Sequence, residues 1–400
     1  MNKSQNLTIL GIDTSCDDTC IAFLKIENQK VKILSNVVSS QVKIHRKYGG
    51  VYPALAKREH QKNLILVFKK GLKEAKLLKN VKCQISKFKI QTLKEILKKY
   101  ETLFKKLKKF LQNYQKPKID LIAVTVGPGL EPCLWVGINF ARALSFWWNL
   151  PVVPVNHIEA HILVNFIGKS QISNFKSQIF PAICLVVSGG HTQLILMKDL
   201  LNLKIIGETR DDAAGECFDK TARVLGMDYP GGPAIEAEAS KLQTTNYKLQ
   251  IKLPRPMIYQ KNFDFSFSGL KTAVLYRVRT KNLKLKTKRL KLKTKGFVRA
   301  MAMEIQQAII DVLIHKTIKA VKKYKAKSII LGGGVAANSK LRQQFKLKIK
   351  NCKLKVNFLV PPKNFCTDNA VMVAISGYFN FHKRGRFHNK IQAKGNLKII

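Results

Sequence analysis

The sequence has few acidic residues for its length. Its 400 residues include 24 Asp and Glu against 72 Lys and Arg, which gives a formal net charge of +48 at pH 7. Two explanations of this excess stay open: a polyanionic partner such as nucleic acid, or a genome-wide preference for lysine. Net charge bears on non-specific binding and not on any particular site, so charge alone does not decide between them.

Three further absences narrow the class of protein. The eight cysteines show no CxxC pair and no ladder of close spacings, which argues against a zinc ribbon or a disulfide framework and fits reduced thiols. The first residues, MNKSQNLTIL, lack the apolar core of a signal peptide. The longest apolar stretch, residues 134–155, contains Arg142, Asn139, Asn149 and two prolines, which argues against a bilayer span. We therefore expect a soluble, cytoplasmic protein.

What is present is the alternating pattern of an α/β protein. Hydrophobic residues make up 46% of the chain, enough for two or three domains with a sizeable core. Short apolar runs that end in glycine recur, with segments of helical period between them, at residues 7–11, 121–127, 183–189 and 328–334. In open α/β sheets ligands bind where strands end, so we expect the function to lie in the turns after these runs.

Two Lys-rich stretches differ from the rest of the chain. Residues 75–118 hold fourteen Lys and two acids, and residues 265–303 hold twelve Lys or Arg and no acid. The second stretch contains LKLKTK twice, at 283–288 and 290–295. The Leu/Lys alternation has the period of a strand, but without a turn signal it equally suits a solvated, low-complexity insertion. We favour the insertion, with an electrostatic nucleic-acid arm as the more specific alternative.

Three of the expected strands run into turns with polar or glycine-rich sequences. The first gives GIDTSCDDT, in which Asp13 and its neighbours could hold a phosphate, a metal or a water; a polar turn closed by Asx and Ser/Thr hydrogen bonds is the alternative. VVSGGHTQLIL, from residue 186, predicts a tight hairpin whose backbone can approach a ligand. IILGGGVAAN predicts a strand-to-helix turn that suits a phosphate or nucleotide, with the helix starting near Ala336.

The segment HIEAH contains two histidines at metal-ligand spacing. On a helix, His157 and His161 lie on one face, as two imidazoles that share a metal require. Glu159 points away from that face, and the order differs from the HExxH of zinc peptidases. Asn156 and Glu159 also fit a helix-capping pair, and a pair of satisfied surface histidines is the alternative to a metal.

A third metal ligand should be a carboxylate or another histidine. From residue 305 onward the only acids are Asp311 and Asp368. Asp368 stands in CTDNAVMVA, before an apolar helix, and solubility is a poor explanation for a lone carboxylate in so basic a segment. A helix N-cap is its alternative role, and the two roles do not exclude one another.

The densest acidic segment is ETRDDAAGECFDKTARVLG. On one helix Asp212, Glu216 and Asp219 would share a face, where three carboxylates could organise a metal-bound triphosphate or ribose hydroxyls. Ordinary ion pairs with basic residues four positions on are the alternative. The following YPGGPAIE adds another glycine turn, in which Gly232 is close enough in sequence to line the same pocket.

Taken together and in order, these motifs resemble the TsaD family, the tRNA N6-adenosine threonylcarbamoyltransferases formerly described as O-sialoglycoprotein endopeptidases. The motifs are GIDTSCDDT, HIEAH, VSGGHTQL, DDAAGECFDK, YPGGPAIE, FSFSGLKTAV, LGGGVAAN and CTDNAVM. The likeness spans the chain apart from residues 75–118, 278–296 and 168–180.

The resemblance implies a two-lobed α/β fold of the actin, Hsp70 and sugar-kinase type. Each lobe would be built on a ribonuclease-H-like sheet, with the active-site cleft between the lobes. The first lobe would comprise residues 1–155, with a Lys-rich insertion at about 75–118, and be completed by residues 366–400. The second would comprise residues 156–365, with a Lys-rich insertion at about 278–296.

The resemblance also implies the site residues. His157, His161 and Asp368 would bind one divalent metal ion per subunit, Fe(2+) first and Zn(2+) as the alternative. Asp13 and Glu216 would be catalytic. The residues implied to bind threonylcarbamoyl-AMP are Val186, Val187, Ser188, Gly189, Gly190, Asp219, Gly232 and Asn338.

The implied reaction moves the threonylcarbamoyl group from threonylcarbamoyl-AMP to N6 of the adenosine next to the anticodon, in tRNAs that read codons starting with A. The implied partners are tRNA and, in a bacterium, a catalytically silent paralogue and a small ATPase, with no membrane. Cys16 is then a packed small residue rather than a nucleophile. The alternatives are a small-molecule O-carbamoyltransferase of the same fold, a metallopeptidase and a non-catalytic nucleotide-binding scaffold.

Overall fold

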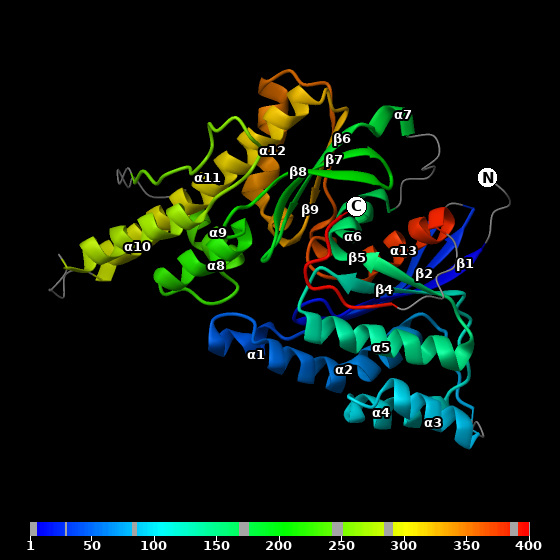
Figure 1. Ribbon diagram of the computed structural model, residues 1–400. Helices are drawn as coiled ribbons and strands as arrows, with labels where there is room; N and C mark the ends of the chain where they lie inside the picture. Colours follow the sequence, from blue (N-terminus) through cyan, green and yellow to red (C-terminus); the bar gives the residue numbers. More distant parts are fainter. Residues whose placement is uncertain are drawn as a thin grey trace. The chain divides into compact units, whose positions relative to one another are not determined.

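The protein is described here by a computed structural model (Figure 1). The structure describes residues 6–28, 30–81, 86–167, 176–241, 251–283, 291–384 and 391–399. Its contacts divide the chain into two compact units. Unit 1 comprises Met1–Lys43, Val51–Lys176 and Asp368–Ile400, and unit 2 comprises Ile44–Gly50 and Ser177–Thr367. Unit 1 therefore continues about twenty residues past the expected end of the first lobe at residue 155, and it includes the HIEAH segment.

Unit 1 is built on a five-stranded mixed sheet. The strands are β1 (Leu7–Asp13), β2 (Asp18–Glu27), β3 (Lys30–Ser40), β4 (Leu121–Gly127) and β5 (Val152–Asn156), in the order β3-β2-β1-β4-β5. The first three strands are antiparallel neighbours, while β4 lies parallel to β1 and β5 parallel to β4. β1 and β4 are buried along most or all of their length, as near-continuous apolar runs predict.

Helices cover both faces of this sheet. α2 (Pro53–Glu74) and α5 (Glu131–Trp148) pack on one face, and α13 (Ala370–Arg384) packs on the other, beside the short α6 (His157–Leu163). The fit of α13 is tight, because a side chain at Gly11 of β1 would clash with the backbone oxygen of Ala370. The start of α13 is thereby fixed against the strand that carries Asp13.

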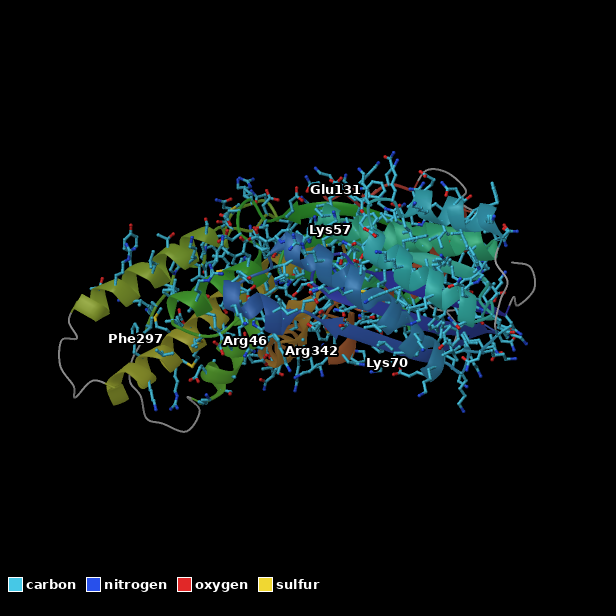
Figure 2. The ribbon with its side chains drawn as sticks, turned by 90° about the horizontal axis from the view of Figure 1, so that it is seen from below. Arg46, Lys57, Lys70, Glu131, Phe297 and Arg342 are labelled. Atoms are coloured by element: carbon cyan, nitrogen blue, oxygen red, sulfur yellow. The ribbon has the colours of Figure 1, made fainter. Side chains whose placement is uncertain are left out.

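The first Lys-rich stretch is folded as two helices, α3 (Lys87–Ile96) and α4 (Glu101–Asn113), which pack behind α2 and α5. α4 buries an apolar stripe against the core of unit 1, formed by Leu103, Leu107, Phe110 and Leu111. The lysines lie on the opposite side of the stripe, and Lys70 of the neighbouring α2 is exposed in the same way (Figure 2). The lysine excess here therefore marks the outer face of an amphipathic helix.

Unit 2 repeats the strand order of unit 1. Its strands are β6 (Ala182–Val187), β7 (Thr192–Asp199), β8 (Asn202–Glu208), β9 (Ser328–Gly332) and β10 (Asn357–Leu359), in the order β10-β9-β6-β7-β8. Again the first three are antiparallel neighbours and the last two continue in parallel. The unit boundaries fall within two short helices, α1 (Val42–His45) and α7 (Lys176–Ile179). The two sheets confirm the predicted α/β class with two lobes.

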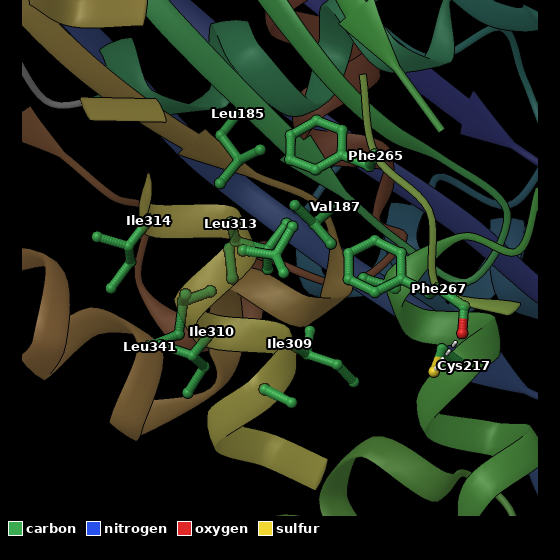
Figure 3. Close-up of a cluster of buried hydrophobic side chains, with 14 of the residues drawn as sticks. Leu185, Val187, Cys217, Phe265, Phe267, Ile309, Ile310, Leu313, Ile314 and Leu341 are labelled. Atoms are coloured by element: carbon green, nitrogen blue, oxygen red, sulfur yellow. Dashed lines mark hydrogen bonds between the residues drawn. The ribbon is translucent and has the colours of Figure 1, made fainter. Parts of the chain in front are cut away.

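The core of unit 2 lies between this sheet and its long helices. The helices are α8 (Ala214–Val224), α9 (Gly231–Ser240), α10 (Ser268–Leu283), α11 (Lys291–Lys323) and α12 (Ser339–Asn351). Leu185 and Val187 of β6 meet Phe265, Phe267 and the apolar face of α11, and the Cys217 thiol donates to the Phe267 carbonyl (Figure 3). Residues 284–290 lie outside the described part of the chain. Residues 291–295 form the start of helix α11, so the second LKLKTK does not form a strand there, although its alternation has the period of one.

The cysteines and the helices bear on two of the expectations from composition. The seven described cysteines, which exclude Cys83, are all free thiols. Among the described helices, none is both long and apolar enough to cross a bilayer.

Candidate metal centre and ligand-binding turns

The HIEAH segment forms a capped helix, as its pattern predicts. The Asn156 side chain accepts hydrogen bonds from the amides of Ile158 (2.9 Å) and Glu159 (3.2 Å), so α6 begins at His157. The Glu159 side chain contacts α13, where its Oε1 accepts from Ser376 and Asn380. Both histidines are buried, at 7% and 0% exposure, and their rings meet edge to face at 4.7 Å.

Asp368 completes a three-residue group with these histidines. Its Oδ1 lies 3.4 Å from Nε2 of His157 and 3.4 Å from Nε2 of His161. One ligand atom from each of the three residues falls within 4.8 Å of the others. The predicted convergence of His157, His161 and Asp368 is thus what the structure shows, and all three belong to unit 1.

The spacing and chemistry of this group fit a divalent metal ion. Four ligands placed tetrahedrally at about 2.1 Å from an ion stand roughly 3.4 Å from one another. Both nitrogens of His161 are buried and make no hydrogen bond within the described part of the chain, and a bound ion would satisfy one of them, Nε2. Two imidazoles and one carboxylate suit Zn(2+) and Fe(2+) alike, so the donor set does not choose between them.

Without an ion, charge is distributed unevenly over the group. Burial opposes a charge on His157, but the carboxylates of Asp368 and Asp13 outweigh it and raise the pKa of His157 to about 10. Burial likewise opposes the charge of Asp368, yet the two imidazoles hold the pKa of that carboxyl below its usual range. Burial lowers the pKa of His161, and its neighbour His157 adds to the effect. The two imidazoles and the two carboxylates therefore interact strongly with one another.

Asp13 stands behind the first histidine. It is the last residue of β1 and fully buried; its Oδ1 accepts from the Ser15 amide (3.0 Å), and its Oδ2 lies 3.3 Å from Nδ1 of His157. A carboxylate on one ring nitrogen leaves the other nitrogen for a metal, the usual arrangement around metal-bound histidine. The structure thus places Asp13 next to one side chain of the candidate metal site, with Nε2 of His157 turned toward Asp368.

His60 supports the bend between β1 and β2, and no motif in the sequence predicted this role. Its Nε2 lies 3.0 Å from the Cys16 carbonyl and its Nδ1 lies 2.8 Å from the Thr19 hydroxyl. Because a carbonyl only accepts, Nε2 carries the proton and Nδ1 accepts from Thr19. The available signal was a lone histidine on the apolar face of α2, one turn from the buried Ala56 and Leu64.

Two other side chains of this bend carry perturbed pKa values. Burial, and then the nearby Asp17 and Asp368, raise the pKa of the Cys16 thiol well above its ordinary value, so Cys16 is a neutral thiol. A neutral thiol is a poor nucleophile, in line with the packing role expected for Cys16. Burial and the charge of Asp368 raise the pKa of Asp18 to about 7.

The glycine-rich turns lie in unit 2. Val186 and Val187 end β6, and the turn to β7 is closed by the Ser188 amide, which donates to the His191 carbonyl (2.8 Å). The predicted hairpin is confirmed. At Gly189 and Gly190 no described atom lies within 4 Å of the place where a Cβ would stand. Packing inside the described chain therefore does not require glycine at these two positions.

The two glycine turns and the start of α8 meet at one edge of the sheet. Gly333, which follows β9, has a φ of +85° and lies against the Val187 backbone, so that any side chain there would clash. Gly215 in the first turn of α8 lies equally close to the Ser188 carbonyl and donates its amide to it (3.2 Å). The backbones at Val187, Ser188 and Gly333 are thus held together within unit 2.

The acidic segment is arranged differently from the expectation. α8 begins at Ala214, so Asp212 precedes the helix and the three carboxylates do not share one helical face. Lys220 lies 2.8 Å from Glu216, one of the ion pairs four positions apart that were the alternative, and it also lies 2.6 Å from Asp212. Asp219 turns instead to the YPGG turn, where its Oδ1 accepts from the Gly231 amide (2.6 Å).

The remaining predicted residues occupy helix starts. Gly232 lies in the first turn of α9. Asn338 caps α12: its Oδ1 accepts from the Leu341 amide (2.9 Å) and its Nδ2 donates to Gln306 (2.9 Å). The helix after the GGG turn that follows β9 therefore begins at Ser339 and not near Ala336, as expected, because residues Gly334–Ala337 form a short 3-10 helix.

Comparison with known proteins agrees with these features. A family model described as "TsaD: tRNA N6-adenosine threonylcarbamoyltransferase" matches residues 32–85 and 94–375. The chain is similar to proteins named tRNA N6-adenosine threonylcarbamoyltransferase from Thermosipho africanus (40% identical over 393 residues, 98% of this chain and 100% of the relative) and Persephonella marina (42% over 384 residues, 95% and 92%).

Among solved structures, full-length HypF in a phosphate- and nucleotide-bound form is similar in fold. The TM-score is 0.50 at 11% sequence identity, and the match covers 97% of this chain. The chain spans about half the length of that protein, 48%. At this identity the likeness concerns the fold alone, and it agrees with the two-lobed α/β architecture that the resemblance implied.

Proposed function

Because the chain belongs to the TsaD family of tRNA N6-adenosine threonylcarbamoyltransferases, we propose that it transfers threonylcarbamoyl from threonylcarbamoyl-AMP to N6 of the adenosine next to the anticodon. Family membership confirms the predicted class of enzyme, a tRNA-modifying transferase. The proposed substrates are tRNAs that read codons starting with A. One observation carries the chemistry: the Nε2 atoms of two buried imidazoles each lie 3.4 Å from the same Asp368 oxygen, with the three ligand atoms within 4.8 Å of one another.

The proposed reaction forms one bond and breaks one. The exocyclic amine of the adenosine attacks the carbamoyl carbon, the C–N bond forms, the bond to the AMP phosphate oxygen breaks, and AMP leaves. The amine is a weak nucleophile and loses a proton in the process, so positioning and a proton acceptor must supply most of the acceleration. AMP is a good leaving group, and no covalent intermediate on the protein is needed, in keeping with a neutral Cys16 thiol.

The residues of unit 1 would hold the metal. His157 and His161 through Nε2 and Asp368 through Oδ1 would bind one Fe(2+), or Zn(2+) in its place. A divalent ion supplies Lewis-acid polarisation of a phosphate or carbamoyl oxygen. Asp13 holds the His157 ring in the orientation that leaves Nε2 for the ion. We keep Asp13 and Glu216 as the proposed catalytic carboxylates, since a carboxylate can accept the proton that the amine loses.

The turns of unit 2 would hold the adenylate. Gly189 and Gly190 leave open space above the backbone, so a phosphate can approach the amides there more closely than a side chain would allow. Val186 and Val187 end strand β6, and Ser188 begins the turn that follows. Asp219, Gly232 and Asn338 are the further proposed contacts to the substrate.

The charge of the chain supports a tRNA partner. A net charge of +48 suits a polyanion whose phosphates are bound without regard to sequence, with an affinity that falls steeply with salt. We propose cytoplasmic action together with a catalytically silent paralogue and a small ATPase. A peptidase mechanism has less support, because the carboxylate of Glu159 is engaged by Ser376 and Asn380.

A reconstituted assay tests this proposal. The chain, with the two proposed protein partners, is mixed with threonylcarbamoyl-AMP and unmodified tRNA, and the modified nucleoside is read by mass with and without a chelator. We expect N6-threonylcarbamoyladenosine with wild type and none with the double variant H157A/H161A, which should retain its fold. Full activity of the metal-free double variant would refute the metal role. Transfer to a small metabolite, without salt-dependent binding of tRNA, would instead favour an O-carbamoyltransferase.

A further inference from the structure

Glu159, between the two histidines of α6, is a buried carboxylate with a defined set of partners. It is 6% exposed, in a chain that has only 24 acids. Its Oε1 accepts from the Ser376 hydroxyl (2.9 Å) and from Nδ2 of Asn380 (2.5 Å), and Asn380 also donates to the Ser376 carbonyl (3.1 Å). A carboxylate is expensive to bury, so an arrangement that satisfies it fixes the elements that carry the partners.

Those partners lie on the helix that follows the third metal-binding residue. Ser376 and Asn380 are one turn apart on α13, which begins two residues after Asp368. The start of α13 is fixed in turn by Asn369, whose Oδ1 accepts from the Met372 amide (3.0 Å). Glu159 therefore connects the helix that carries both imidazoles with the helix that sets the position of the carboxylate. All of these residues lie within unit 1.

We propose that Glu159, together with Ser376 and Asn380, is a positioning group that sets the separation of His157 and His161 from Asp368. α6 has only seven residues, so its own backbone hydrogen bonds hold it weakly, and it needs tertiary contacts to keep a fixed place. Ligand atoms 3.4 Å apart tolerate little displacement of α6 along α13 before one of them leaves the ion. This inference rests on the proposed metal site, and it assigns Glu159 no contact with substrate.

The test is a Co(2+) titration of the full-length chain, followed by the visible absorption of the bound ion, which reports affinity and coordination geometry together. E159A should bind Co(2+) about 10- to 100-fold more weakly than wild type, with an altered spectrum, because loss of an outer partner of metal ligands has that effect. E159Q retains an oxygen that accepts both hydrogen bonds and should stay within about threefold of wild type. S376A and N380A should fall between the two.

A matched control separates positioning from general stability. Asn139 is buried in α5 of the same unit, and its Nδ2 donates to the Trp135 carbonyl (2.9 Å). N139A should lower the midpoint of urea unfolding while leaving the Co(2+) affinity and spectrum unchanged. Unchanged Co(2+) binding by E159A, S376A and N380A would overturn the proposal, and so would an equal loss in N139A. If wild type itself bound no Co(2+), the metal site and this inference would both fail.

Discussion

The contact between Asp13 and His157 gives a quantitative prediction for metal affinity. Oδ2 of Asp13 and Nδ1 of His157 are 3.3 Å apart, and the side chains are 0% and 9% exposed. Unit charges at that separation attract by about 5 kcal/mol at an effective dielectric constant near 20. A metal-bound imidazole carries only part of a unit charge on its N–H. We therefore expect D13N to lose about 1.4–2.7 kcal/mol of metal binding, a 10- to 100-fold weaker affinity.

Competition between the protein and a coloured chelator for Co(2+), at neutral pH, measures this loss. H157A, which removes the ligand itself, sets the scale of complete disruption. A D13N affinity within about twofold of wild type would refute the reasoning, since the contact would then contribute nothing to the site. Transfer activity at saturating Co(2+) separates two roles of Asp13: recovery shows that it only supports His157, and a persistent loss shows that it also acts on the substrate.

Three further predictions concern residues around and beyond the site. H60A should raise the hydrogen-exchange rate of the amides in residues 14–18 about tenfold and leave β4 unaffected, because a lost hydrogen bond costs ~1.4 kcal/mol. An equal increase of the exchange rate in β4 would argue against a local role of His60. L107A should lower the free energy of unfolding by about 2–5 kcal/mol in urea titrations, and K109A by no more than about 0.5; equal losses would contradict the packing of α4. Burial and then Lys319 lower the pKa of Lys316 to about 8, so between pH 8 and 10.5 the unfolded chain binds more protons than the folded chain. The free energy of unfolding of wild type, measured relative to K316M, should therefore increase as pH rises from 8 toward 10.5. A difference that stays constant over this range would refute the prediction.

The strands and the metal group were accessible from the sequence because their signals are local. Four apolar runs ending in glycine became β1, β4, β6 and β9, each within a few residues of its expected bounds. The spacing of His157 and His161, together with the capping residue Asn156, predicts the start of α6 from local sequence alone. Asp368 was identifiable because it is nearly the only acid in a long basic segment.

Other features depend on tertiary contacts that no local pattern encodes. The segment around Glu216 suggested one helix with three carboxylates, but α8 starts two residues after Asp212, and Lys220 binds two of the three. Glu159 has the position of a capping residue, and only the packing of α13 on α6 shows that its carboxylate turns to Ser376. In the stretch 75–118, the number of lysines concealed a regular stripe of buried leucines on α4.

The shared order of strands gives the chain an internal pseudo-symmetry, in which β1 corresponds to β6 and β4 to β9. Under this correspondence the hairpin after Asp13 is the counterpart of the hairpin at Gly189, and the GPG turn after β4 is the counterpart of the GGG turn after β9. The two halves differ in chemistry at these hairpins: the first places the Asp13 carboxylate there, and the second has the glycines Gly189 and Gly190. A substitution in the hairpin after β1 can therefore be compared with one in the hairpin after β6.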